Sequence, residues 1–163
     1  MFRFLHRKRL VNIDAKGLAQ LMYEDVSSDR WDQENLTKRN LNFSIDSICY
    51  IDTYTTRLLT TEAGKTLLQN HFDSFVIRLG AYTGEVIRRN SQQDFAWYEL
   101  DSVCHYSAKW DEVYDADPDE AVLYSKTKDM ALFPLSVVRQ FLKGDSPYPN
   151  FLSYVDEVLK EYR

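Results

Sequence analysis

The sequence has 163 residues, of which 44% are hydrophobic and 28% are charged, and its formal net charge is −5. This composition is typical of a globular protein and argues against disorder over most of the length, and the size favours one domain over residues 1–163. The acidic balance argues against direct binding of nucleic acid, and no apolar run reaches the roughly 20 residues that a membrane-spanning helix needs.

The first 13 residues are basic and are expected to form a flexible tail. Four positive charges precede the first acidic residue, Asp14, so the rest of the chain has 16 basic and 25 acidic residues and a charge of −9. Because apolar residues precede these charges, the segment does not have the order of a secretory signal, and we expect a cytoplasmic protein. A solvated tail is favoured over a weak anchor on an anionic membrane. The four basic residues are Arg3, Arg7, Lys8 and Arg9.

Helical patterns dominate the first ninety residues. Asp14 and Ser44 are suited to cap helices, and Thr61 or Glu62 opens a further one. The stretch 29–42 is polar and connects the first two helices. Apolar residues then recur at helical spacing, which predicts that the helices cover residues 14–28, 44–59, 61–68 and 73–89.

After Asn90 the hydrophobic period changes from about 3.6 to 2, which predicts strands. Pro134 suits the first turn of a helix that Gly144 ends, and a last helix follows Pro149. The predicted strands cover residues 95–100, 103–110, 121–124 and 130–133. The expected fold class is therefore α+β, with a helical N-terminal half, a small antiparallel sheet and two closing C-terminal helices.

Motifs of catalytic chemistry are not evident in the sequence. The run 64–66 resembles the end of a phosphate-binding loop, but Leu59 occupies the place of its first glycine. The three histidines share no metal-ligand spacing with one another or with the cysteines. We therefore expect a protein that is not an enzyme, with no catalytic residues, no metal and no cofactor. Cys49 and Cys104 are expected to be two buried thiols, with a single disulfide as the alternative.

The most informative stretch is the helix around residue 80. Each glycine inside a helix costs about 0.8–1.0 kcal/mol relative to alanine, so Gly80 and Gly84 indicate close approach by another element. Glu85 and Arg89 form an i,i+4 pair in the favourable order. A structural ion pair is favoured for Glu85 over a role as the polar group of a ligand pocket. The candidate structural or pocket residues are Gly80, Tyr82, Gly84, Glu85, Arg88, Arg89 and Trp97.

A second feature is the acidic run at residues 111–120, which holds six carboxylates. Such a surface suits docking onto a basic partner, with an aromatic residue as the buried anchor. A solvated loop between strands is the alternative. The candidate partner-binding residues are Trp110, Asp111, Glu112, Tyr114, Asp115, Asp117, Asp119 and Glu120.

Several segments together resemble a group of small uncharacterised bacterial proteins. Residues 42–48 and 50–54 are similar to its first motif, a serine-capped helix with a central aspartate. Residues 80–89, with the sequence GAYTGEVIRR, are similar to its second and most specific motif. A strand with Trp97 and the segment 133–144 complete the match. Some members of the group are associated with toxins, so the resemblance implies an immunity protein without catalytic residues.

Three hypotheses of function follow. The favoured one is a non-enzymatic immunity protein or antitoxin that binds and neutralises a cognate bacterial toxin, such as a basic nuclease, through its acidic and aromatic surface. The alternative is a small ligand-binding domain or enzyme with a pocket beside the glycine-rich helix that uses Glu85. The third is a module that self-associates through exposed aromatic residues, and the oligomeric state is left open.

Overall fold

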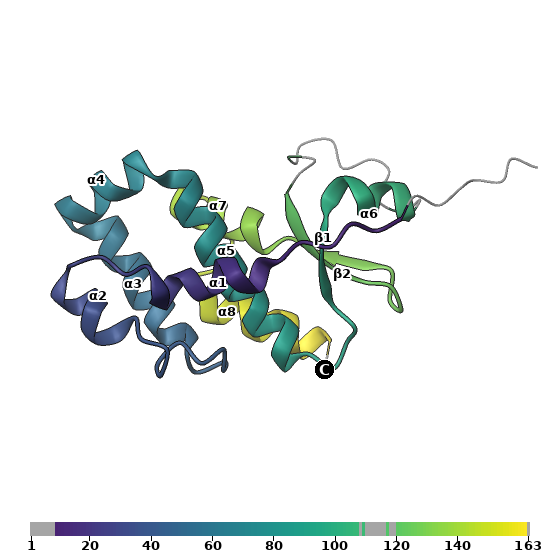
Figure 1. The fold of residues 1–163 in the computed structure, drawn as a ribbon, viewed down its shortest axis with the longest axis horizontal. Helices are drawn as coiled ribbons and strands as arrows, with labels where there is room; N and C mark the ends of the chain where they lie inside the picture. The colour runs from purple at the N-terminus through teal and green to yellow at the C-terminus, as the bar shows by residue number, and fades with distance from the viewer. Residues whose placement is uncertain (1–8, 108, 110–116, 118–119, 163) are drawn as a thin grey trace, which may run out of the picture.

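The computed structural model describes residues 9–162 except 108, 110–116 and 118–119. It confirms the predicted α+β fold, with a helical N-terminal half, a small antiparallel sheet and two helices that close the chain (Figure 1). Of the helices in these residues, none is both long and apolar enough to cross a membrane.

The N-terminal half forms the four helices that the hydrophobic spacing predicts, and a further short helix at Arg30–Asn35 where a polar connection was expected. The Asp14 side chain accepts a hydrogen bond from the Gly17 amide at 3.1 Å, and the Thr61 hydroxyl accepts one from the Gly64 amide at 3.0 Å. Both bonds satisfy amides that the first turn of a helix leaves unpaired. The helices are α1 (Ala15–Glu24), α2 (Arg30–Asn35), α3 (Ile48–Thr60), α4 (Glu62–Asn70) and α5 (Phe72–Asn90).

The start of α3 differs from the prediction that Ser44 caps it. The helix begins at Ile48, after a turn in which Ser44 Oγ accepts a hydrogen bond from the Ser47 amide at 3.2 Å. Before this turn, Phe43 has a φ of 62°, in the left-handed region, and its amide donates to the Tyr82 hydroxyl at 3.2 Å. A tertiary contact to α5 therefore fixes a bend directly before residue 44, where the local sequence predicts that the helix begins.

The second half of the chain forms a three-stranded sheet in the described residues, followed by two helices. Strand β1 pairs with β2 and β2 pairs with β3, both antiparallel, with Trp97 opposite Leu123 and Leu123 opposite Leu132. The predictions of strands at 95–100, 121–124 and 130–133 and of both closing helices are confirmed. The elements are β1 (Ala96–Glu99), α6 (Leu100–Tyr106), β2 (Ala121–Ser125), β3 (Met130–Leu132), α7 (Pro134–Leu142) and α8 (Phe151–Glu161).

The prediction of a strand at 103–110 is wrong for its first half, because residues 100–106 form helix α6, and residues 108 and 110 lie outside the described part of the chain. The run is short, and its apolar residues fit both an alternating and a helical spacing. As a helix, it buries Leu100 and Val103 on one side, against Tyr98 and Tyr124 of the sheet. Burial against the sheet therefore selected the helical conformation.

The predicted flexible tail at 1–13 is corrected at its C-terminal end. The Val11 carbonyl accepts a hydrogen bond from the Glu99 amide at 2.9 Å, and the Ile13 amide donates to the Trp97 carbonyl at 3.2 Å. These bonds line the segment up beside β1 in antiparallel fashion. Residues 1–8 lie outside the described part of the chain.

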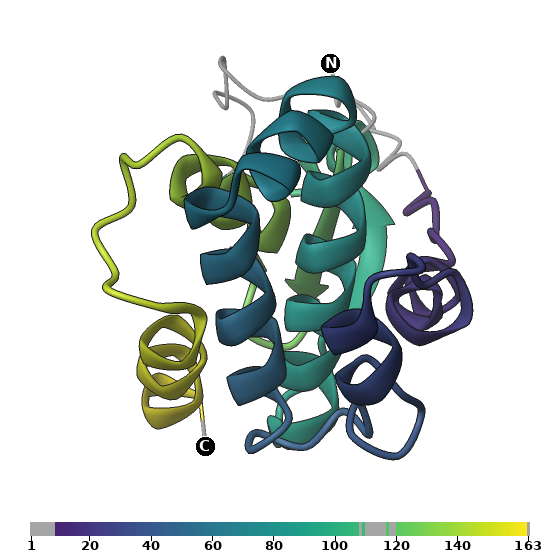
Figure 2. The ribbon, with the colours of Figure 1, turned by 90° about the vertical axis from the view of Figure 1, so that its left-hand side faces the viewer.

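Helix α5 is the central element of the fold. It packs against α1 on one side and against α7 and α8 on another. Figure 2 shows α1 and α8 on opposite sides of the α3 and α5 pair, and Figure 1 shows the sheet and α6 at one end of the helices. The functional candidates described below all lie on or beside α5.

The two glycines of α5 are packing residues, as predicted. A Cβ atom added at Gly80 would lie 2.8 Å from the Leu135 side chain and 2.9 Å from Leu135 Cα. A Cβ atom added at Gly84 would overlap ring atoms of Trp97 and lie 3.1 Å from Pro134 Cγ. The glycines therefore let both β1 and the start of α7 approach the backbone of α5 closely.

Candidate functional site

Glu85 is the centre of a buried ion-pair cluster. Its side chain is 1% exposed and accepts hydrogen bonds from Arg88 Nε at 2.7 Å, Arg88 Nη2 at 3.1 Å and Arg89 Nε at 3.0 Å. The indole Nε1 of Trp97 donates a further bond at 2.8 Å. A carboxylate has about four acceptor positions, so this one is fully used. The predicted pair with Arg89 is confirmed, and the structure adds two further partners.

These contacts make Glu85 a structural anchor. Burial by itself raises the pKa of Glu85, but the hydrogen bonds from Arg88, Trp97 and Arg89 outweigh burial and hold that pKa below its ordinary value. A shallow depression of about 280 Å³ reaches the cluster, yet both carboxylate oxygens are already bonded. The alternative that used Glu85 as the polar group of a ligand pocket is therefore wrong.

Tyr82 also has a structural role. Its side chain is fully buried, and its hydroxyl lies 2.7 Å from Ser47 Oγ and 3.2 Å from the Phe43 amide nitrogen. Tyr82 thus joins α5 to the turn before α3. The structure brings Glu85 together with Arg88, Arg89 and Trp97, whereas Tyr82 serves a different contact of the same helix.

The ionisation of Glu85 predicts a loss of stability in acid. Its pKa is lower in the folded protein than in the unfolded chain, so its contribution is complete above about pH 4.3 and is lost as the pH falls through the folded pKa. The difference in free energy of unfolding between the wild type and Glu85→Gln should be constant from pH 7 to 5 and shrink toward pH 3. Urea titrations at each pH measure it. A difference that grows in acid would contradict this assignment.

Asp52 changes the pH dependence of stability in the opposite direction, so the wild type must be compared with Glu85→Gln at each pH. Burial raises the pKa of Asp52, although its carboxylate accepts hydrogen bonds from the Phe151 and Leu152 amides at 2.7 and 3.2 Å. A raised pKa favours the folded state in acid. Because Asp52 is present in both proteins, the difference between wild type and Glu85→Gln removes its contribution.

A separate pocket of about 400 Å³ lies where α1, α5, α7 and the start of β2 meet. Its floor is apolar, and its polar groups are three carboxylates and one guanidinium. The apolar lining residues are Ile13, Ala15, Leu18, Val76, Ile77, Ala81, Ala121 and Leu135, and the charged ones are Asp73, Asp117, Glu120 and Arg139.

The pocket is shaped by the packing of α7 on α5. Because Leu135 meets Gly80 and the Lys143 ammonium lies 5.8 Å from the centre of the Phe72 ring, α7 runs antiparallel to α5. Arg139 follows Leu135 by four residues and therefore lies on the same face of α7. Asp73 stands in the first turn of α5, where a helix favours negative charge.

Glu120 and Arg139 form an ion pair in the wall of the pocket. Glu120 Oε1 lies 3.1 Å from Arg139 Nη1, and the Ser136 hydroxyl donates to the carboxylate at 3.2 to 3.3 Å. The Glu120 side chain is 2% exposed, and that of Arg139 is 36% exposed. The guanidinium thus stands between a buried carboxylate and the open pocket.

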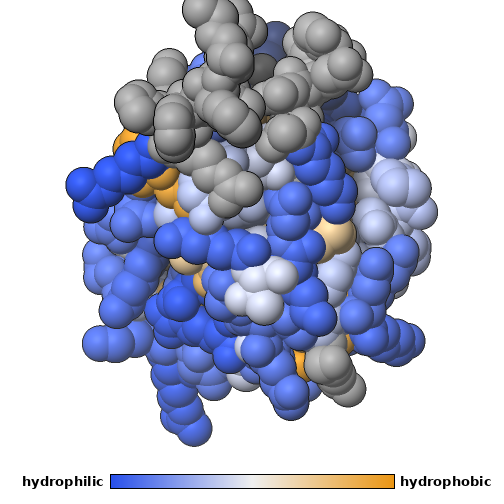
Figure 3. Space-filling model, turned by 90° about the vertical axis from the view of Figure 1, so that its right-hand side faces the viewer, coloured by the Kyte–Doolittle hydropathy of each residue, from blue (hydrophilic) through white to orange (hydrophobic). Residues whose placement is uncertain are grey.

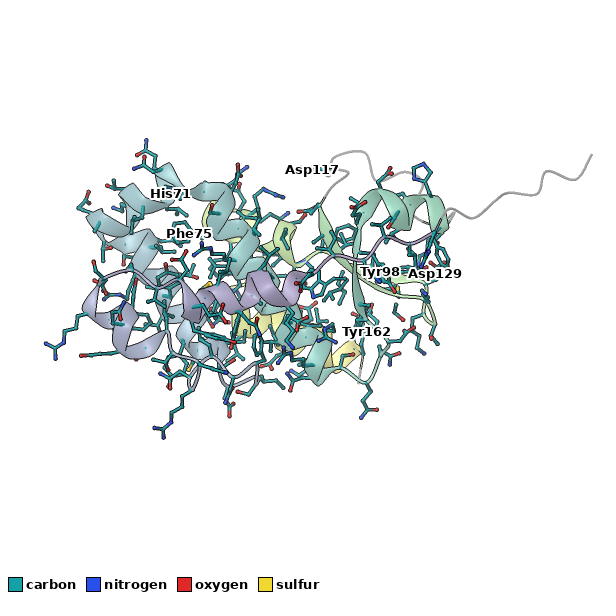
Figure 4. The ribbon with its side chains drawn as sticks, viewed as in Figure 1. His71, Phe75, Tyr98, Asp117, Asp129 and Tyr162 are labelled. Atoms are coloured by element: carbon teal, nitrogen blue, oxygen red, sulfur yellow. The ribbon has the colours of Figure 1, made fainter. Side chains whose placement is uncertain are left out.

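The burial of Glu120 corrects its expected place on a docking surface. Its carboxylate points inward to α7, and its backbone bonds to the Leu100 amide and the Asp117 carbonyl, both at 2.9 Å. Asp117 is exposed and lies between the helices and the sheet (Figure 4). The other predicted partner-binding residues are outside the described part of the chain: Trp110, Asp111, Glu112, Tyr114, Asp115 and Asp119.

Asp73 and Arg139 were not singled out by the sequence. One feature of the sequence could have indicated Arg139. It follows Leu135 by four residues in a predicted helix and therefore lies on the same, inward face. Asp73 had none, because an aspartate at a helix start is ordinarily explained by the helix dipole.

The remaining sequence candidates have structural explanations or weak support. Neither cysteine forms a disulfide, but Cys49 is exposed and Cys104 is half-buried where burial of both was expected. Of the described residues, the exposed large hydrophobic ones are Val11, Leu67 and Ile77, and no aromatic is among them. Figure 3 shows a largely hydrophilic face with scattered apolar residues. The described surface therefore offers no exposed aromatics for self-association.

Comparison with known proteins yields one partial match to a curated protein. The chain is 34% identical over 92 residues to a queuine tRNA-ribosyltransferase of Prochlorococcus marinus (strain MIT 9211). The alignment covers 50% of this chain and 25% of the enzyme, so the chain spans a quarter of that relative's length. No known family profile matches the sequence, and no solved structure matches it either.

This comparison corrects the favoured hypothesis of function. The protein matched is an enzyme, and nothing found in the comparisons is an immunity protein or antitoxin. The expectation that this chain neutralises a cognate toxin is therefore wrong. The resemblance of residues 80–89 to a bacterial protein group stays a prediction from the motif.

Proposed function

We propose that this chain is a binding domain for a small organic cation with an apolar or aromatic body. The observation that carries the proposal is the pocket between α1, α5, α7 and β2, with its apolar floor and its excess of carboxylates. A few polar groups around a mainly apolar cavity are typical of small-molecule sites, and about 400 Å³ lies within their usual range of volumes.

The charges of the lining favour a cation. Glu120 and Arg139 neutralise each other across 3.1 Å, and Asp73 adds a further carboxylate to the described lining. Apolar walls focus the field of such carboxylates and raise the local concentration of positive ligands. An anion of the same size would meet the negative charge of Asp73.

The partial relative supports a nitrogen-containing ligand. The name of the Prochlorococcus enzyme states that it acts with queuine on tRNA. Queuine is a heterocyclic base that carries an amine, the kind of group that the acidic rim suits. We carry over only this ligand class, because the alignment covers a quarter of the enzyme.

Binding without turnover fits the chemistry of the lining. The described residues around the pocket include no histidine, cysteine, serine, lysine or tyrosine. Glu120, the most buried acid of the described lining, is held by Arg139 and Ser136 and is poorly placed to move a proton. We therefore propose that the chain binds its ligand unchanged.

Two matched ligands test this function. Tryptamine and indole-3-propionate share a ring and differ in the charge of their side chain, and calorimetry should detect binding of tryptamine only. The variant Asp73→Asn should weaken tryptamine binding by about fivefold, since one carboxylate charge of modest strength is lost. Queuine serves as a third ligand.

The matched control is Asp46→Asn, which changes an exposed carboxylate outside the pocket lining. It should leave the affinity for tryptamine within about twofold of the wild type. Equal binding of tryptamine and indole-3-propionate, or no binding of tryptamine and queuine, would reject the proposal.

A further inference from the structure

We propose that Arg139, oriented by Glu120, selects ligands that carry a neutral hydrogen-bond acceptor in addition to their cationic amine. This inference rests on the proposed function and names its ligand class more closely. The acceptor is a carbonyl oxygen or a ring nitrogen, and it receives a hydrogen bond from the guanidinium at the wall of the pocket.

The first support is that Arg139 has donors left for a ligand. A guanidinium carries five N–H donors, and the protein uses Nη1 for the bond to Glu120 at 3.1 Å. The side chain is 36% exposed and lines the pocket. Among the described residues, its other donors have no bonded partner and are open to a ligand or to solvent.

The second support is that Glu120 holds Arg139 in place. The carboxylate is 2% exposed, and its position is set by the Ser136 hydroxyl and by backbone bonds to Leu100 and Asp117. An arginine restrained in this way loses less side-chain freedom when a ligand binds. Glu120 is thus a positioning residue and Arg139 the residue that contacts the ligand.

The charge balance favours a neutral acceptor over a carboxylate. The charge of Arg139 is already compensated by Glu120, and Asp73 adds a negative charge to the lining. A ligand carboxylate would be repelled by these groups, whereas a carbonyl can accept a bond from Arg139 without adding charge.

Three indole ligands of graded chemistry test the inference. Tryptamine carries an amine alone, tryptophanamide adds a neutral carbonyl, and tryptophan adds a carboxylate. Calorimetry with the wild type should give tryptophanamide about tenfold tighter binding than tryptamine, as expected for one bond from a charged donor. Tryptophan should bind more weakly than tryptamine.

Two variants test whether Arg139 and Glu120 cause the preference for tryptophanamide over tryptamine. Arg139→Lys keeps a positive partner for Glu120 but loses the planar donors, so the ratio of the two affinities should fall to about twofold or less while tryptamine binding is retained. Glu120→Gln leaves Arg139 with a neutral acceptor in place of a carboxylate. The weaker bond holds the guanidinium less firmly, so the same ratio of affinities should fall. Because the readout is a ratio within one folded protein, a general loss of stability does not imitate it.

The outcomes separate the two proposals. If the wild type binds tryptamine and tryptophanamide equally, or if Arg139→Lys keeps their ratio, the role of Arg139 is rejected while the cation site stands. If tryptophan binds best, the acceptor is a carboxylate and the inference is also rejected. If none of the three ligands binds, the proposed function itself fails.

Discussion

Replacing Glu85 with alanine is expected to lower the free energy of unfolding by about 3 kcal/mol. Removing one partner of a buried ion pair usually costs about 3–5 kcal/mol, because the partner groups remain without compensation. Here Arg88 and Arg89 are 36% and 32% exposed and can be solvated again, which places the effect at the low end. The buried Trp97 indole also loses its acceptor. Urea unfolding at pH 7 measures the change.

The matched control is Glu34→Ala, which removes the same residue type from an i,i+4 pair with Arg30 on the surface. The two side chains are 59% and 90% exposed, so the expected effect is below about 0.5 kcal/mol. A Glu85→Ala protein that unfolds at the same urea concentration as Glu34→Ala would show that the cluster does not stabilise the fold.

Replacing Gly84 with alanine is expected to destabilise the protein by about 1–2 kcal/mol, although alanine is the better helix former. The new Cβ would overlap the Trp97 ring, which is 5% exposed and tied to Glu85 through its indole nitrogen, and Pro134 closes the other side. Overpacking costs about 1–3 kcal/mol, and a direct overlap with a buried ring belongs in the upper half of that range, whereas helix propensity returns only about 1 kcal/mol. Thermal and urea unfolding both measure the net change in stability.

Gly17→Ala is the control for the gain in helix propensity. A Cβ at Gly17 would approach only the exposed Asp14 side chain, at 3.2 Å or more, so Gly17→Ala should stabilise the protein by up to about 1 kcal/mol. If Gly84→Ala proved as stable as the wild type, the close approach of Trp97 to α5 would not be the reason for the glycine.

Most of the helical architecture could be predicted because the signals are local. The Asp14 and Thr61 caps act on amides three residues ahead, and Pro134 and Gly144 mark the ends of α7. The Glu85 and Arg89 pair is likewise set by a spacing of four residues. Such contacts form within one turn of one element, so the sequence alone indicates them.

Predictions failed where a distant contact decides the local structure. The period of two after Leu100 indicated a strand, but burial on Tyr98 and Tyr124 of the sheet selects helix α6. Ser44 had the right residue type for a cap, but the chain bends at Phe43, whose amide bonds to the Tyr82 hydroxyl. Helix α3 therefore begins only at Ile48. In both places the residues were compatible with two conformations.

In the candidate site, too, the sequence indicated the local contacts but not the contacts between distant residues. The sequence by itself determined that Gly80 and Gly84 accept a close neighbour and that Glu85 is paired, since helix geometry dictates both. Only the tertiary structure showed that Trp97 joins Glu85 and that Glu120 meets Arg139, nineteen residues away. The pocket exists because α7 crosses α5 at Gly80, and a pairing between distant elements depends on how whole apolar faces pack, which residue spacing along one chain does not specify.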